Sequence, residues 1–335
     1  MLQNYHYFLV LAEEQNISKA AKRLFISHQC LSKYLKDLEQ HYHVALFNRK
    51  PSLSLTPAGK ILQESLLQIQ LIEKNIESQF FDYYKADTGL IHLGTTEGRY
   101  RILIPSLISS FRESYPDVQL LAESATAEKL TEKILNNKLD MAISIGFTSQ
   151  DHRLVSKLLV NENLYLVISE TMLKRYFPER YPSCKTDFEN GVNLREFTHV
   201  PFILNKKKRI SRNMLDLYCL QNNITLNCCM ELSQGDMHYL MTAQDYAASF
   251  CLSMYVSAIE AINQSGQGAS PLHVFPINGM NLTSPTHLIY RKDKIFPEYG
   301  KHLIHLIEEH CRLYKTSYDF SEDAHLQTLS SPDLP

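Results

Sequence analysis

The chain has 335 residues, of which 44% are hydrophobic and 21% charged, and its formal net charge is −2. This composition is typical of a soluble globular protein of two or three domains and excludes a wholly disordered chain. The apolar runs are too short for a membrane span, and the first residues lack the basic and apolar regions of a signal peptide. The seven cysteines have no C-x-x-C spacing, which favours a reduced, cytoplasmic protein over a disulfide framework.

Enzyme signatures are missing from the sequence. The eleven glycines form no phosphate-binding loop, no dinucleotide fingerprint and no nucleophile elbow. We also find no convergent set of nucleophile, acid and base. We therefore expect no catalysis, no cofactor and no metal site.

Charge is distributed unevenly along the chain. Residues 1–60 carry a net charge of +4, from eight Lys or Arg and four acids, whereas the other 275 residues carry −6. A small basic unit joined to a larger acidic one suggests a nucleic-acid module on a different kind of domain. An excess of four charges can also arise by chance, so composition alone leaves both interpretations open.

The first sixty residues predict three helices followed by a hairpin wing. Apolar residues recur at helical spacing from Tyr5 to Ala12. A second helix, capped by Asn16 or Ser18, is expected to bury Ala20, Ala21 and Leu24. The third helix begins after Ser27 and has two opposite faces. Its apolar face carries Leu31, Leu35 and Leu38, and its polar face carries Gln29, Ser32, Lys33 and Lys36. This is a helix-turn-helix pattern, although a plain three-helix bundle with a solvated face would show the same periodicity.

The segment from Asn16 to Leu62 resembles the N-terminal domain of the LysR-type transcriptional regulators. The matching residues are Ala20-Ala21, Leu24, Ser27, Leu31-Ser32, Leu38-Glu39, Leu46-Phe47-x-Arg49 and Leu55-Thr56-x-Ala58-Gly59. The resemblance implies a winged helix-turn-helix in residues 1–58 that binds double-stranded DNA. It also implies roles for single residues. His28, Gln29, Ser32 and Lys33 would face base edges, and the DNA backbone would be contacted by Ser27, Lys36, Arg49 and Thr56.

A long helix is predicted to follow, since proline is absent from Ala58 to Tyr84. A narrow apolar stripe that needs a partner runs along it: Leu62, Leu66, Ile69, Ile76, Phe80 and Tyr83. The stripe could pack on its own chain. The resemblance instead implies a linker helix, residues 59–88, that pairs two subunits in a homodimer or homotetramer.

From residue 91 onward, predicted strands and helices alternate, which favours α/β domains with largely parallel sheets. Ligands of such sheets bind beyond the carboxyl ends of strands. Hydroxyl residues stand at these ends, and we expect them to bind a small polar or anionic effector: Thr95, Thr96, Ser124, Thr126 and Ser144. Ordinary helix capping would explain any single one of them.

Residues 91–144 resemble the first half of the LysR-type effector-binding domain, with landmarks Leu93-Gly94, Ile104-Pro105, Phe111, Tyr115-Pro116 and Leu139-Asp140-x-Ala142. The implied fold is periplasmic-binding-protein-like, with two α/β subdomains. Subdomain I would take 89–162 and 268–312, subdomain II 163–267, and a polar tail 313–335.

The resulting prediction is a cytoplasmic regulator whose effector shifts the subunit arrangement, with RNA polymerase as a further partner. One alternative keeps DNA binding but replaces the small ligand with thiol redox state or a protein partner. The other is an enzyme or small-molecule-binding protein with an incidental N-terminal bundle. The basic run Lys206–Arg209, the cysteines Cys219 and Cys228, and the histidines His302 and His305 receive no firm role.

Overall fold

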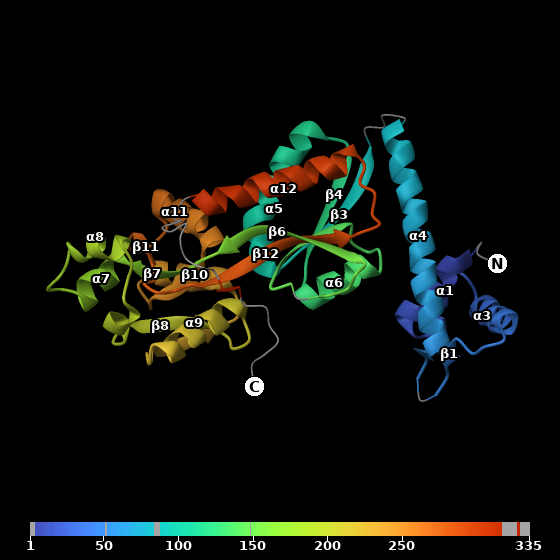
Figure 1. Cartoon of the computed structure of the whole chain (residues 1–335), viewed down its shortest axis with the longest axis horizontal. Coiled ribbons are helices and arrows are strands. Elements are labelled where there is room, and N and C mark those ends of the chain that lie inside the picture. The colour runs from blue at the N-terminus through green and yellow to red at the C-terminus, as the bar shows by residue number, and fades with distance from the viewer. Residues whose placement is uncertain (1–3, 51, 84–87, 148, 317–326, 329–335) are drawn as a thin grey trace. The chain divides into compact units, whose positions relative to one another are not determined.

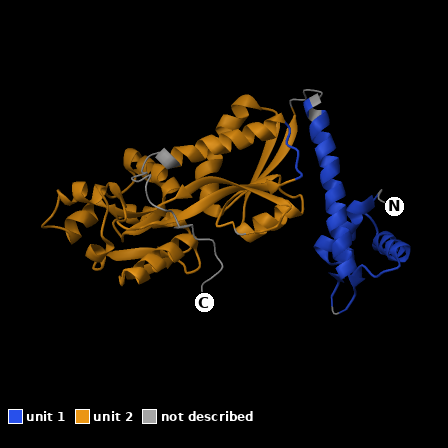
Figure 2. Ribbon diagram, in the orientation of Figure 1, with its two compact units in different colours: residues 1–86, 293–297 blue, residues 87–292, 298–335 orange. Residues whose placement is uncertain are grey.

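The computed structural model describes residues 4–50, 52–83, 88–147, 149–316 and 327–328. The chain forms two compact units, one of residues 1–86 with 293–297 and one of residues 87–292 with 298–335 (Figure 2). Within the described residues, no helix combines the length and hydropathy needed to cross a lipid bilayer.

The first unit is a helix-turn-helix domain with a two-stranded wing and a long helix (Figure 1). Its elements are α1 (Tyr5–Glu14), α2 (Ile17–Arg23), α3 (His28–Tyr42), β1 (Phe47–Asn48), β2 (Ser54–Leu55) and α4 (Pro57–Tyr83). Of the two candidate caps for α2 the structure selects Asn16, and the predicted cap of α3, Ser27, is confirmed. Asn16 accepts a hydrogen bond from the Lys19 amide at 3.0 Å, and Ser27 accepts one from the Cys30 amide at 3.1 Å. These bonds fix where α2 and α3 begin.

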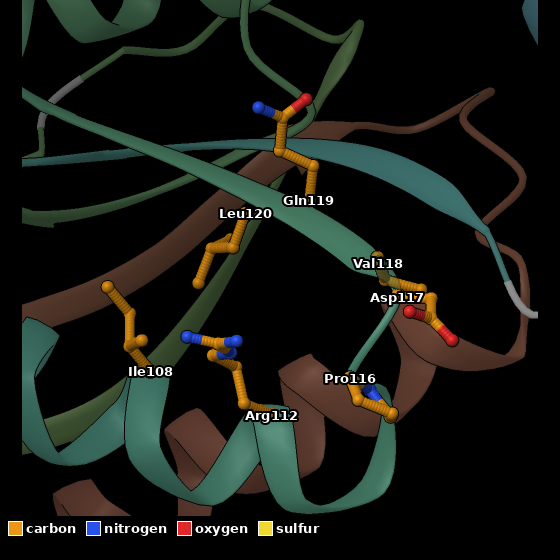
Figure 3. A pocket seen from close by; sticks show the side chains of 7 residues that line it. All are labelled: Ile108, Arg112, Pro116, Asp117, Val118, Gln119 and Leu120. Carbon is orange, nitrogen blue, oxygen red and sulfur yellow. The ribbon is translucent and has the colours of Figure 1, made fainter.

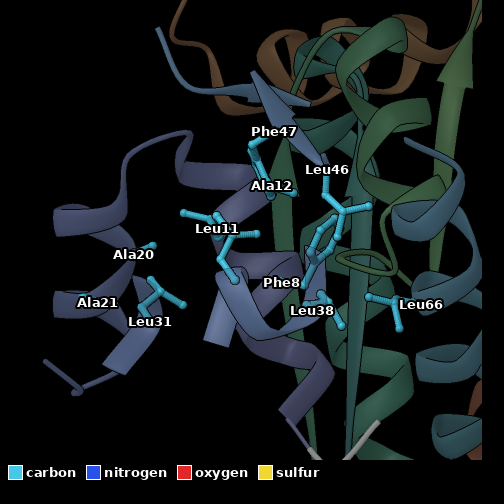
Figure 4. Close-up of a cluster of buried hydrophobic side chains, with 11 residues drawn as sticks. Phe8, Leu11, Ala12, Ala20, Ala21, Leu31, Leu38, Leu46, Phe47 and Leu66 are labelled. Atoms are coloured by element: carbon cyan, nitrogen blue, oxygen red, sulfur yellow. The ribbon is translucent and has the colours of Figure 1, made fainter. Parts of the chain in front are cut away.

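One apolar core holds the helix-turn-helix domain together (Figure 4). Phe8 and Leu11 of α1, Ala20 of α2, and Leu31 of α3 are fully buried in it. The small side chain of Ala20 allows close packing of α2, as its position in the sequence predicts. Leu66 of α4 is part of the same core, so this part of the long helix packs against the helix-turn-helix domain.

One part of the predicted apolar stripe of α4 is packed against the domain core, and the other part is exposed. Leu62, Leu66 and Ile69 pack on the helix-turn-helix core, which is the same-chain alternative. Ile76 and Phe80 remain exposed, and Ile61 and Ile72 lie exposed on the same side of the helix. We call Ile61, Ile72, Ile76 and Phe80 the linker stripe. The side chain of Tyr83 and the predicted helix end at 84–87 lie outside the described part of the chain.

The second unit contains the elements β3 (Gly89–Thr95), α5 (Glu97–Ser114), β4 (Val118–Ser124), α6 (Ala127–Leu135), β5 (Met141–Ile145), β6 (Leu154–Glu162), β7 (Leu164–Ser169), α7 (Glu170–Tyr176), α8 (Cys184–Glu189), η2 (Leu194–Phe197), β8 (Pro201–Asn205), α9 (Ile210–Gln221), β9 (Asn227–Leu232), α10 (Gly235–Ala243), β10 (Ser249–Leu252), η3 (Ser253–Tyr255), α11 (Val256–Ser265), β11 (Leu272–Pro276), β12 (Leu282–Arg291), α12 (Glu298–Thr316) and β13 (Gln327–Thr328). Most of the predicted polar tail, 317–326 and 329–335, lies outside the described residues.

The larger subdomain is built on the sheet β13-β12-β5-β3-β4, with β6 paired to β12. Strands β4, β3 and β5 are parallel, but β12 runs antiparallel to both β5 and β6. Helix α6 covers one face, where Leu130 and Ile134 pack on Ala142 and Ile289.

The smaller subdomain corrects the expectation of largely parallel sheets. Its sheet β10-β7-β11 is entirely antiparallel, whereas β8 and β9 pair in parallel. Strand β7 is buried along its whole length, and a continuous apolar run of this kind looks the same in parallel and antiparallel sheets.

Candidate DNA-binding and effector sites

Helix α3 separates its apolar and polar faces completely. Leu31, Leu35 and Leu38 are 0%, 2% and 7% exposed. The polar residues fall into two groups: Ser32 is half-buried, while Ser27, His28, Gln29, Lys33 and Lys36 are exposed. The structure therefore brings six of the eight predicted DNA-binding residues onto the cap and one face of a single helix. This face offers hydrogen-bonding groups at its leading end and cations further along, as a helix in the major groove requires.

The two hydroxyl residues predicted at the DNA backbone differ in what they can still donate. The Ser27 oxygen accepts the Cys30 amide, which leaves the hydroxyl proton available to a phosphate. The Thr56 hydroxyl donates its one proton to the Ala45 carbonyl at 2.7 Å and accepts the Gly59 amide at 3.0 Å. A donated bond from Thr56 to a phosphate would have to replace the bond to Ala45.

Glu39 fastens the wing to α3. One of its carboxylate oxygens accepts the Leu46 and Phe47 amides at 2.8 and 3.2 Å, and the other lies 3.3 Å from the Arg49 guanidinium. The Arg49 side chain is 69% exposed, so it can reach a phosphate while Glu39 limits where it points. Glu39 is a residue that spacing alone did not single out as functional.

The predicted effector residues gather at the carboxyl edge of β4, β3 and β5. Thr95 pairs in register with Ser124 on one side and Ile143 on the other, and the Thr96 amide donates to the Ile143 carbonyl at 3.2 Å. Thr95 and Ser144 are fully buried. Thr126 is separate in character, because its hydroxyl caps α6 by accepting the Lys129 amide at 3.4 Å.

Two buried polar atoms flank Ser144 without a hydrogen-bond partner in the part of the chain that the structure describes. They are Thr96 Oγ1 and the Nδ1 of His287, the β12 residue paired in register with Ser144. Burial lowers the pKa of His287, which favours its neutral form. A buried polar group without a partner is destabilising, so this edge of the sheet suits a ligand that supplies hydrogen bonds.

The first residues of α5 form contacts between the two subdomains. Gln234 donates to the Glu97 carboxylate at 3.1 Å, and Arg101 forms an ion pair with Asp236. The Tyr255 hydroxyl lies so close to Gly98 that a β-carbon there would be 1.9 Å from it, which explains the glycine. The predicted hydroxyl edge therefore lies beside the junction of the subdomains.

A buried network at this junction was missed by the sequence analysis. The Arg99 guanidinium pairs with Glu162 and donates from Nε to the Thr286 hydroxyl at 3.1 Å, and that hydroxyl donates to Glu162 at 2.8 Å. The residues come from α5, β6 and β12. No local pattern connects positions so far apart, and a charged residue in a helix or strand is usually solvated.

A separate surface pocket of about 380 Å³ lies between α5 and the amino end of β4 (Figure 3). Ile108, Val118 and Leu120 supply apolar walls, and the Arg112 side chain extends between Ile108 and Leu120. It contains none of the predicted effector residues.

The cysteines and histidines without a firm role lie in different surroundings. Burial raises the pKa of Cys219 to about 11, which keeps this thiol protonated and unreactive near neutral pH. The ring of His302 packs against Tyr115 at 5.4 Å, and His305 lies 3.3 Å from Glu309. Among the described residues, no three potential ligands come together around a metal position.

Comparison with known proteins matches both units to models of the LysR family. Residues 2–60 match the model of the bacterial regulatory helix-turn-helix protein, lysR family, and residues 85–312 match the LysR substrate binding domain. The HTH-type transcriptional activator CmpR of Synechocystis sp. is 24% identical over 88% of this chain and 90% of its own length. A probable RuBisCO transcriptional regulator of Thalassiosira pseudonana is 28% identical over 80% of each chain.

Solved structures share the fold. A full-length OxyR variant from Pseudomonas aeruginosa aligns with a TM-score of 0.64 at 18% identity, over 93% of this chain and 95% of that one. Full-length CbnR in complex with its target DNA aligns with a TM-score of 0.53 at 19% identity, over 94% and 99%. Together with the two family matches, these observations show that the chain belongs to the LysR family of DNA-binding transcriptional regulators.

Proposed function

We propose that the protein reads DNA with the leading half of α3. Gln29, Ser32 and Lys33, with His28 beside them, would contact base edges in the major groove. Ser27, Lys36 and Arg49 would contact the backbone, and Thr56 would position the wing. The observation that supports this proposal is the exposed polar face of α3 opposite three buried leucines.

Selection of duplexes from a random-sequence pool by the full-length chain tests DNA reading directly. Lys33→Ala should then weaken binding to a selected duplex by about tenfold, since one good side-chain contact contributes about 1–3 kcal/mol to base discrimination. Lys129→Ala removes an exposed lysine from α6 and serves as the control. Unchanged affinity and an unchanged salt dependence in Lys33→Ala would contradict a groove contact by this residue.

The same proposal includes a pair of subunits. The linker stripe exposes four large apolar side chains on one side of α4, and a second copy of α4 would cover them. Two copies of α3 could then address two half-sites on one duplex. We propose a homodimer or homotetramer that acts in the cytoplasm, without catalysis of its own, and that engages RNA polymerase at its promoters.

For regulation, we propose a small polar or anionic effector at the junction of the two subdomains. Thr95, Thr96 and Ser144 would contact it, with Ser124 and Thr126 at the rim. The buried Thr96 hydroxyl without a partner supports this assignment. An effector changes DNA binding only if it binds the two arrangements of the protein with different affinity. Domain boundaries at 58, 88 and 312 belong to the same proposal. Subdomain II, predicted as 163–267, would extend to include β11, because β11 pairs with β7.

Thermal shift screening of small carboxylates with the full-length chain tests effector binding. A compound that stabilises the wild type should lose most of its effect on Thr96→Val, which removes the hydroxyl and keeps the shape. Thr198→Val makes the same change at an exposed threonine outside the proposed site and is the matched control. An equal thermal shift in Thr96→Val and wild type would place the effector elsewhere.

A further inference from the structure

The turn between α2 and α3 carries an aromatic side chain in solvent. Phe25 is 95% exposed, and its backbone is left-handed with φ of 56°. The turn itself is well formed, since the Phe25 amide donates to the Lys22 carbonyl at 3.2 Å and the Ile26 amide to the Ala21 carbonyl at 3.0 Å. Leu24 and Ile26 pack on the domain core on either side, whereas Phe25 does not.

A residue with left-handed backbone follows each of α1, α2 and α3, and two of these three residues are polar. Gln15 after α1 has φ of 48°, and His43 after α3 has φ of 54°. Glycine or asparagine is the usual choice at such a position, because a bulky side chain crowds the backbone there. Phe25 therefore combines a strained backbone with an apolar ring in water, and this ring takes no part in the core formed by the described residues of its domain. Strain of this kind is typical of functional positions.

Phe25 stands next to the DNA-reading end of α3. It precedes the Ser27 cap by two residues, which places the two α-carbons within about 7 Å. Ser27, His28 and Gln29 follow as exposed residues at the start of the helix, the part of a recognition helix that meets base edges. Exposed lysines stand near the turn in the sequence, at 19, 22 and 33, and their charge favours a polyanion over an apolar protein surface as the partner.

We propose that Phe25 is a specificity-determining residue that packs its ring against the methyl group of a thymine in the major groove. The methyl group is the one apolar feature that a base presents there, and a phenyl ring can read it without hydrogen bonds. This inference rests on DNA reading by α3 and names a base class for it. Contact with DNA would also bury the ring that the free domain leaves in water.

A uracil scan tests the inference, because deoxyuridine lacks only this methyl group. The probe is a duplex selected by the wild-type chain from a random pool, with each thymine replaced in turn. We expect one thymine per half-site whose replacement weakens wild-type binding by about 3–10-fold, the range expected for loss of one buried apolar contact. Phe25→Gly should weaken binding to the unmodified duplex by a similar factor and should no longer respond to that replacement.

Two variants separate this contact from other effects. Phe25→Gly relieves the left-handed backbone and should melt no lower than wild type, so that weaker DNA binding does not reflect unfolding. His43→Gly makes the same change at the other end of α3 and should leave DNA affinity unchanged. The salt dependence should stay constant in Phe25→Gly, because no charge is removed.

The outcomes are distinct. A wild-type chain that selects no duplex would overturn DNA reading by α3 and this inference together. Selection by the wild type with equal binding by Phe25→Gly would overturn only the role of Phe25. Weaker binding by Phe25→Gly with an unaltered uracil scan would overturn the thymine contact.

Discussion

Arg99 and Glu162 form an ion pair that is almost completely removed from solvent, with side chains 5% and 1% exposed. The pair joins the first turn of α5 to the end of β6, and the Thr286 hydroxyl bonds to both partners. Both α5 and β6 border the junction of the two subdomains. The ion pair therefore holds α5 and β6 together beside the proposed effector site.

Glu162→Ala should destabilise the protein strongly, because it leaves the Arg99 charge buried without its partner. Removal of one member of a buried pair costs about 3–5 kcal/mol. Urea unfolding of the full-length chain measures the change. Lys157→Ala is the control, since Lys157 pairs with Glu308 at 2.5 Å but is 51% exposed, and such pairs contribute about 1 kcal/mol or less. Equal losses in the two variants would show that the Arg99 charge is solvated.

Acid should weaken the smaller subdomain through Glu170. Burial raises the pKa of this carboxyl, but hydrogen bonds from Tyr181, His273 and Lys185 outweigh that effect and lower the pKa to about 2. A carboxyl with a lowered pKa stabilises the fold above its unfolded pKa near 4.3, and this stability is lost as pH falls from about 5 to about 2.

Glu170→Gln should therefore cost about 1–2 kcal/mol at neutral pH, and the gap to wild type should close as pH falls below about 5. Urea midpoints at several pH values measure it. Glu189→Gln, an exposed carboxylate in the same subdomain, is the matched variant. A gap that stays constant down to pH 3 would argue against the bonded carboxylate.

Asn75 of α4 holds a backbone segment with both ends of its amide. Its nitrogen donates to the Asp293 carbonyl at 2.6 Å, and its oxygen accepts the Ile295 amide at 2.9 Å. Asn75→Ala should leave both backbone groups without this partner and speed hydrogen exchange of the Ile295 amide. Exchange mass spectrometry of peptides from 290–297 measures this, with α3 peptides as the internal control. Unchanged exchange in 290–297 would mean that other contacts hold the segment.

Ile76→Glu should separate subunits, because it places a charge within the linker stripe. We expect a lower mass by light scattering and weaker binding to two-half-site DNA. Glu77→Lys changes a neighbouring exposed residue off the stripe and should keep the mass of the wild type. A wild-type chain that is monomeric at micromolar concentration would contradict the pairing of α4.

Local patterns predicted what local interactions determine. The spacing of Leu31, Leu35 and Leu38 and the cap at Ser27 place α3, since each depends on residues within a few positions. The Arg99–Glu162 pair could not be predicted, because it depends on three elements meeting in space. The stripe of α4 lies between these cases. Its spacing predicted an apolar face, but Leu66 and Ile76 are equivalent in the sequence pattern, and only the structure shows that Leu66 packs in the domain core while Ile76 is exposed.

The assignment of residues 293–297 to the N-terminal unit has a practical consequence for dissecting the protein. The polypeptide passes between the two units three times, near residues 87, 293 and 298. A fragment that ends at residue 86 therefore lacks the backbone segment 293–297, to which Asn75 forms hydrogen bonds. A fragment that begins at residue 87 contains this segment but lacks Asn75. Separately expressed halves would each be missing a piece, so measurements on them report on incomplete bodies.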